Sequence, residues 1–171
     1  MLEVAAEPIE LRRSIDRAVR AEAARWPAIT FSAHIPVDLP IAVGSEGYVA
    51  RILANLLSNA GKYSRPGGTV EVSAEAVGDD ILIRVVDAGV GIDVDPATLF
   101  SLFYRAPTAA SHAAGSGVGL FVCARLVEAM GGRIWASPRA EGGAEFGIAL
   151  RRFEPAAASL SNTTATSVTP A

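Results

Sequence analysis

Residues 45–63 carry the strongest periodic signal in the chain. Apolar residues recur there at intervals of three, four, seven and eight, which is the spacing of one face of an α-helix. The apolar positions are Val49, Ile52, Leu53, Leu56, Leu57 and Ala60. Gly67 and Gly68 follow and end the pattern. We therefore expect one long amphipathic helix whose apolar face packs firmly against another layer of the fold.

The same helix carries a second, polar stripe formed by Asn55, Asn59 and Lys62. At ~100° per residue these side chains lie together, roughly 120° from the centre of the apolar face. Asparagine is only a middling helix former, whereas amide oxygens can ligate a hard cation and an ammonium group can neutralise phosphate. A solvated polar face explains the stripe equally well. Tyr63 lies nearer the apolar border, as part of a pocket wall or of the core.

The rest of the chain alternates between helical and strand patterns. Helical spacing is found over residues 10–26 and about 118–130, and alternation typical of strands over 29–35, 41–43, 70–76, 81–87, 134–136 and 146–150. This order predicts an α+β fold, a two-layer α/β sandwich with helices on one face of a mixed, mostly antiparallel sheet.

Length and composition indicate one domain. The 171 residues, 50% of them hydrophobic, suffice for one globular core. We expect the domain to cover residues 1–153, with 1–8 as the remnant of a linker. Ala, Ser and Thr dominate 154–171 without periodicity, which predicts a disordered tail.

Charge and cysteine content exclude several classes of partner. A net charge of −3 provides no basic surface for nucleic acid or an anionic membrane. The single cysteine, Cys123, can form no internal disulfide, and we expect it in the core. No signal peptide and no apolar run of roughly 18 residues is present. A cytoplasmic domain without direct membrane contact is expected, and a membrane-anchored parent protein is compatible with this.

Two glycine-rich clusters follow the long helix. In the first, Asp87 ends a strand and is followed by Gly89 and Gly91; its carboxylate can accept from the exocyclic amine of adenine, although a surface turn would have the same composition. The second cluster opens a helix and holds Gly115, Gly117, Val118, Gly119 and Leu120. Backbone amides at such a helix start can bind phosphate.

The order of these clusters resembles a known family. Asn55 to Tyr63, Asp87 to Ile92, Leu99 to Arg105 and Gly115 to Leu120 are similar to the N, G1, F and G2 boxes of the histidine kinase ATPase domain. That domain belongs to the GHKL group, which includes gyrase, Hsp90 and MutL. The resemblance covers about residues 7–151 and implies the Bergerat ATP-binding fold.

The resemblance also implies roles for individual residues. Asn59 would ligate Mg²⁺, Asn55 would lie close to the metal and phosphates, and Lys62 and Tyr63 would surround the phosphates and the nucleotide. Asp87 would bind the adenine amine. The other implied ATP-binding residues are Gly89 and Gly91 at the base pocket, Phe103 and Arg105 at the lid anchor, and Gly115, Gly117, Val118, Gly119 and Leu120 on the phosphate side.

The sequence departs from the family pattern in four places. The segment Glu141 to Phe146 resembles the closing G3 element but has Ala144 where the family often has Ser or Thr. Ser45 stands where Asp is common, and Gly61 lowers helix propensity by ~1 kcal/mol. The expected mobile lid, 106–114, contains no Lys or Arg and only His112 as a possible cation.

The resemblance favours a kinase over a hydrolase. ATP hydrolases of this group place a general-base Glu where this chain has Asn55, and an amide cannot take a proton from water. Asn55 and Lys62 are therefore expected to position and stabilise phosphoryl transfer. Neither His34 nor His112 has the context of a phosphoacceptor.

The expected partners are a His-containing dimerisation domain outside this chain and a response regulator, as in two-component signalling. A stand-alone anti-sigma-type Ser kinase and a nucleotide-binding or interaction module with weak or no catalysis remain alternatives.

Overall fold

The computed structural model describes residues 7–102 and 117–155. In chain order, its elements are β1 Glu7–Ile9, α1 Leu11–Arg25, β2 Thr30–His34, β3 Ala42–Gly44, α2 Glu46–Tyr63, β4 Thr69–Val77, β5 Asp80–Asp87, the 3₁₀ turn η1 Pro96–Phe100, α4 Gly119–Ala129, β6 Arg133–Pro138 and β7 Ala144–Arg151. The two predicted helices outside 45–63 and the six predicted strands are therefore found within a few residues of their expected bounds.

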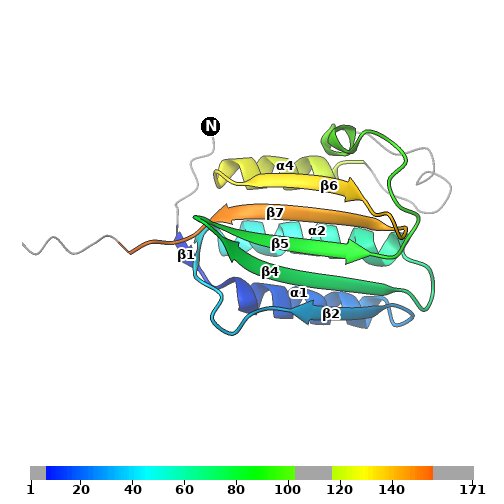
Figure 1. Cartoon of the computed structure of the whole chain (residues 1–171), viewed down its shortest axis with the longest axis horizontal. Helices are drawn as coiled ribbons and strands as arrows, with labels where there is room; N and C mark the ends of the chain where they lie inside the picture. Colours follow the sequence, from blue (N-terminus) through cyan, green and yellow to red (C-terminus); the bar gives the residue numbers. More distant parts are fainter. Residues whose placement is uncertain (1–6, 103–116, 156–171) are drawn as a thin grey trace, which may run out of the picture.

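Five strands form the main sheet in the order β2-β4-β5-β7-β6 (Figure 1). β2 runs parallel to β4, and the remaining neighbours are antiparallel. The register between β5 and β7 places Asp87 opposite Ala144. This pairing brings the start of the first glycine-rich cluster beside the segment 141–146, which lies more than fifty residues later in the chain.

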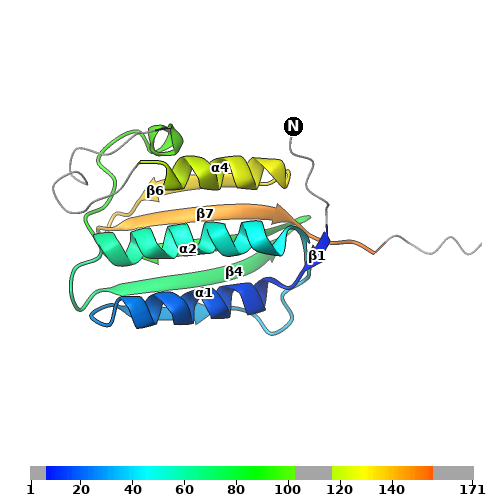
Figure 2. The ribbon, with the colours of Figure 1, turned by 180° about the vertical axis from the view of Figure 1, so that it is seen from behind.

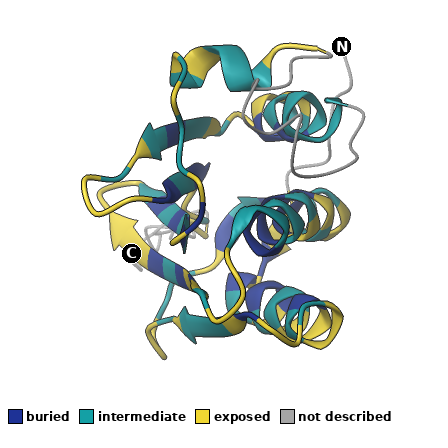
Figure 3. Ribbon diagram, turned by 90° about the vertical axis from the view of Figure 1, so that its right-hand side faces the viewer, coloured by how far each residue is buried: buried dark blue, intermediate teal, exposed yellow. Residues whose placement is uncertain are grey.

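The three helices α1, α2 and α4 all lie on one face of this sheet (Figure 2). An end-on view separates the helical layer from the sheet layer (Figure 3). The predicted α+β fold, a two-layer sandwich on a mixed, mostly antiparallel sheet, is confirmed.

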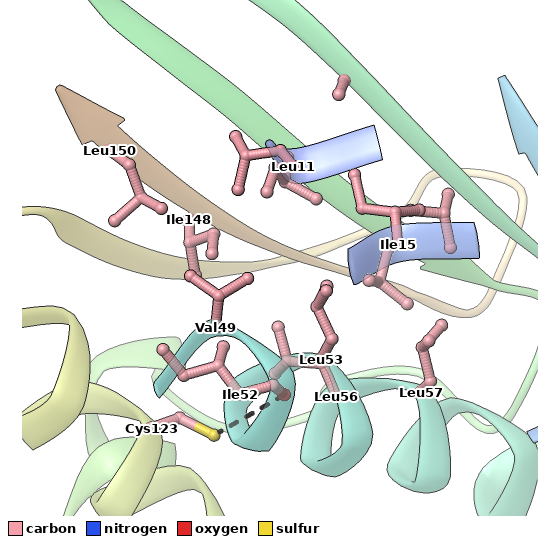
Figure 4. Close-up of a cluster of buried hydrophobic side chains, with 14 of the residues drawn as sticks. Leu11, Ile15, Val49, Ile52, Leu53, Leu56, Leu57, Cys123, Ile148 and Leu150 are labelled. Atoms are coloured by element: carbon pink, nitrogen blue, oxygen red, sulfur yellow. Dashed lines mark hydrogen bonds between the residues drawn. The ribbon is translucent and has the colours of Figure 1, made fainter. Parts of the chain in front are cut away.

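The core lies between the two layers and is centred on α2 (Figure 4). All six apolar positions predicted for the inner face of this helix are buried. They pack with α1 through Leu11 and Ile15 and with the sheet through Ile148 and Leu150. Because the apolar face is committed to the core, the polar stripe of α2 is left toward the rim of the helical layer.

Two elements were not expected from the sequence. Residues 7–9, which belong to the expected linker remnant, form β1 and pair with β3 in a separate two-stranded sheet. Leu99 and Phe100 form the end of η1, whose N-cap is Asp95, and Phe103 lies outside the described residues. With only three residues and no apolar run, the segment 7–9 carries too little alternation to be recognised as a strand from sequence alone.

The chain ends lie partly outside the described residues. The expected tail, 154–171, is described only at residues 154 and 155. Near this end the backbone of Phe153 donates to the carbonyl of Ile41 at 2.8 Å. In the described parts of the chain, none of the helices combines the length and apolar character needed to cross a membrane.

Candidate functional site

Glu22 and Asp87 are the two buried carboxylates in the described residues, and Asp87 has 4% of its surface exposed. It ends β5, and its Oδ1 accepts a hydrogen bond from the Gly89 backbone at 2.8 Å. Burial raises the pKa of Asp87, while hydrogen bonds from the backbones of Gly89 and Ala144 and the charge of Arg139 act in the opposite direction. A buried acceptor of this kind is costly unless polar groups satisfy it.

The glycines beside Asp87 are required by close backbone contacts. A Cβ atom added at Gly89 would overlap the carbonyl oxygen of Tyr63, and one at Gly143 would overlap the carbonyl oxygen of Asp87. Gly91 adopts a φ of 82°, which side chains rarely tolerate. Gly143 was not predicted as a site residue. Its signal was the Gly142-Gly143 pair in the segment similar to the G3 element.

The C-terminal end of α2 reaches the same place. The backbone of Val90 donates to the carbonyl of Tyr63 at 3.3 Å, so the end of the helix is tied to the loop after β5. Arg139 approaches from the other side and donates to the carbonyl of Asp87 at 3.4 Å. The predicted residues Tyr63, Asp87 and Gly89 are thus brought together at one end of α2.

The polar stripe of α2 runs away from this end. Asn55, Asn59 and Lys62 are all half-buried. The Lys62 Nζ lies 5.2 Å from the centre of the Tyr63 ring. The Asn55 Nδ2 donates to the carbonyl of Arg51 at 3.1 Å, which holds the amide in one orientation.

The beginning of α4 faces this stripe. A Cβ atom added at Gly119 would lie 2.7 Å from the Asn55 Oδ1, so only glycine lets the two helices come this close. Gly117 has a φ of 69°, Val118 is the N-cap residue, and Leu120 is half-buried in the first turn. The first backbone N–H groups of a helix have no partner within it and can donate to an anion.

Three predicted site residues, Phe103, Arg105 and Gly115, lie outside the described residues. The same is true of the expected lid, 106–114, with His112. Their roles remain predictions.

The described groups suit a phosphorylated ligand. The Asn55 amide oxygen meets the start of α4, and the helix that carries Asn55, Asn59 and Lys62 ends beside the loop that follows the buried Asp87. Within residues 7–102 and 117–155 no three His, Cys, Asp or Glu side chains gather in a way that could hold a metal. Amide and phosphate oxygens are ligands that Mg²⁺ accepts, so the asparagines of α2 are suited to bind a hard cation together with a phosphate.

Comparisons with known proteins agree with this arrangement. A sensory kinase named "Adaptive-response sensory kinase SasA", from Synechococcus sp. (strain CC9311), is 36% identical over 120 residues. The match covers 69% of this chain and 31% of that relative, so the chain spans about a third of the length of this relative.

Solved structures show the same fold. The mycobacterial sensor histidine kinase MprB superposes with a TM-score of 0.75 at 25% identity, and the match covers 86% of this chain and 97% of that one. Full-length ShkA in complex with AMPPNP superposes with a TM-score of 0.77 at 26% identity, covering 90% of this chain and 33% of that one.

A family model described as "Histidine kinase-, DNA gyrase B-, and HSP90-like ATPase" matches residues 44–153, which include α2, Asp87 and α4. The resemblance stated from the sequence is confirmed. The chain belongs to the histidine kinase-, DNA gyrase B- and HSP90-like ATPase family.

Proposed function

We propose that this chain is the ATP-binding catalytic domain of a sensor histidine kinase. It binds Mg·ATP and transfers the γ-phosphoryl group to a His on a separate dimerisation domain, from which a response regulator receives it. The observation that carries the proposal is that the polar stripe of α2 meets the start of α4 through Asn55, while the C-terminal end of the same helix is tied to the loop after the buried Asp87.

The adenine would bind at Asp87. A carboxylate fixed by the Gly89 backbone can accept a hydrogen bond from the exocyclic amine of the base, and Gly89 allows the close approach to the Tyr63 carbonyl that holds this loop against α2. Guanine presents a carbonyl at the equivalent position and would face an unfavourable pair of acceptors. This predicts selectivity for adenine over guanine.

The phosphates would extend from this end along α2. Asn59 supplies an amide oxygen to Mg²⁺, Asn55 lies close to the metal and the phosphates, and Lys62 neutralises negative charge. The N–H groups at the start of α4 donate to the phosphate oxygens. A Mg²⁺ ion held by the Asn59 amide oxygen would supply positive charge that offsets the charge developing during transfer.

Transfer to a protein, rather than to water, follows from Asn55. Its amide is held by the carbonyl of Arg51 and turned toward Gly119, and an amide cannot act as a base near neutral pH. His34 is exposed at the end of the edge strand β2, on the opposite edge of the sheet from β6. This supports an acceptor His on another domain. A domain that takes its phosphate from ATP is expected to lie inside the cell.

The first experiment is a titration of the purified chain with a fluorescent ATP analogue, with and without Mg²⁺. Asn59→Ala should remove the dependence of binding on Mg²⁺, and Asp87→Ala should lower affinity at least about tenfold because the adenine loses a charged partner. Asp79→Ala, in the exposed turn between β4 and β5, is the matched control and should bind as the wild type does. No binding by the wild-type chain would overturn the proposal.

A second assay separates kinase from binding module. Radiolabelled ATP is supplied together with a dimerisation domain from a related sensor kinase, and acid-labile phosphate on that domain is measured. Mg·ATP binding without transfer to any supplied domain would favour the non-catalytic alternative, which the absence of Lys and Arg from residues 106–114 also supports.

A further inference from the structure

Arg51 lies on the same stripe of α2 as the proposed nucleotide ligands. It precedes Asn55 by four residues, so it is displaced by about 6 Å along the helix and about 40° around it. Its residue surface is exposed, unlike the half-buried Asn55 and Asn59. Within the described residues the Arg51 guanidinium forms no ion pair, so its charge is not neutralised by a neighbouring carboxylate.

The charge of Arg51 acts on the side of α2 that faces α4. The two helices run antiparallel, because Gly119 lies against Asn55 while the Cys123 Sγ lies 4.0 Å from the carbonyl of Ile52 (Figure 4). Burial raises the pKa of the Cys123 thiol, and the positive charge of Arg51 is among the effects that lower it. Arg51 therefore lies one helical turn beyond Asn55, near Cys123 in the second turn of α4, on the side of α2 that faces α4.

The order of residues along α2 determines which part of a bound nucleotide would lie nearest to Arg51. One end is marked by Asp87 and by the contact between Val90 and Tyr63. Asn59 and then Asn55 follow along α2, with Arg51 beyond them. A nucleotide with its base at Asp87 and its phosphates along this stripe brings its last phosphate nearest to Arg51.

We infer that Arg51 binds the terminal phosphate of the nucleotide and so lets the site distinguish a nucleoside triphosphate from a diphosphate. This rests on the proposed function. Arginine suits the task because its planar fork can donate two parallel hydrogen bonds to phosphate and remains charged at all physiological pH values. It would also supply, from a rigid helix, a positive charge of the kind that residues 106–114 lack.

The test compares two nucleotides in the full chain. Isothermal titration with Mg²⁺ present measures the affinity for a non-hydrolysable ATP analogue and for ADP in the wild type, Arg51→Gln and Arg51→Lys. Arg51→Gln should weaken the triphosphate analogue at least about tenfold and ADP less than about twofold, since only the former reaches this residue. The Arg51→Lys variant should show an intermediate loss of affinity for the triphosphate analogue, because lysine keeps the positive charge but lacks the planar pair of donors of arginine.

Arg20→Gln is the matched control. Arg20 is an exposed arginine of α1, a different helix from the one that carries Asn55 and Asn59. The affinities of Arg20→Gln for the triphosphate analogue and for ADP should both be unchanged. An equal loss for both nucleotides in Arg51→Gln, or no loss for the triphosphate, would overturn the inference while leaving the proposed function intact. Failure of the wild type to bind either nucleotide would overturn both.

Discussion

At the scale of single residues, Asp87 has the clearest energetic signature. Sequence alone placed this carboxylate at the end of a strand, before two glycines, where the cluster taken by itself favoured a surface turn. The structure buries it, and burial raises its pKa. The charged form is thus held in a place that disfavours charge, which is a frequent property of binding residues.

This burial predicts a specific pH dependence of stability. Because the carboxyl group binds its proton more tightly in the folded chain, it stabilises the fold as pH falls toward 3.8, its ordinary value, and this stabilisation is lost as pH rises through the raised pKa. Asp87→Asn removes the effect. The free energy of unfolding of the wild type, minus that of Asp87→Asn, should therefore decrease from about pH 4 to about pH 7.

Urea denaturation of both proteins across this pH range measures the difference. A difference that does not change with pH would contradict the account of Asp87 as a buried acid. Chemical denaturation is suitable here because the comparison cancels the titration of all other carboxyl groups, which the two proteins share.

At the scale of elements, α2 contains two glycines with opposite consequences. Gly61 was expected only to weaken the helix. In the structure it lies beneath the indole of Trp26 at the end of α1, and an added Cβ would come within 2.6 Å of the ring. Trp26 is itself held by a hydrogen bond from its Nε1 to the Glu22 carboxylate at 2.9 Å. Gly47, in the first turn, has no atom closer than 4.0 Å to such a Cβ.

These two glycines form a matched pair of substitutions. Gly47→Ala should stabilise the chain by about 0.5–1 kcal/mol, because alanine is the better helix former. Gly61→Ala gains the same helix propensity but must displace the ring, at a cost of about 1–3 kcal/mol, and should be destabilising overall. Thermal and urea unfolding of both variants provide the measurement. If Gly61→Ala is instead more stable than the wild type, the contact between α1 and α2 adjusts to the added methyl group at little cost in free energy.

At the scale of the whole molecule, Cys123 reports on global stability. It is fully buried between α4 and α2, and burial raises its pKa to about 12. Both properties suppress the reactive thiolate. Labelling by a thiol reagent should therefore require unfolding of the helical layer, with a rate that rises steeply with urea and follows the population of the unfolded state.

The control places a thiol on the same helix. In a Cys123→Ala, Arg125→Cys variant the thiol is at an exposed position of α4 and should react rapidly without denaturant. Rapid labelling of Cys123 in the native wild type would instead indicate that α4 separates locally from α2.

The sequence by itself determined the elements and the order of the motifs. Helical and strand periodicity depends on which residues of a segment face the core, so it can be recognised within ten to twenty neighbouring residues. The six inward positions of α2 and the stripe of Asn55, Asn59 and Lys62 are properties of one helix and follow from its 3.6-residue repeat. For the same reason the layered α+β fold was predictable.

Only the tertiary structure decided which distant residues meet. The register of β5 against β7 puts Gly143 on the Asp87 backbone, and the antiparallel packing of α2 and α4 places Asn55 beside the start of α4, with Arg51 one turn farther along. Such contacts depend on strand register and helix approach, which a local pattern does not encode. The need for glycine at positions 61 and 143 is explained by such contacts, because each glycine leaves room for a group contributed by another element.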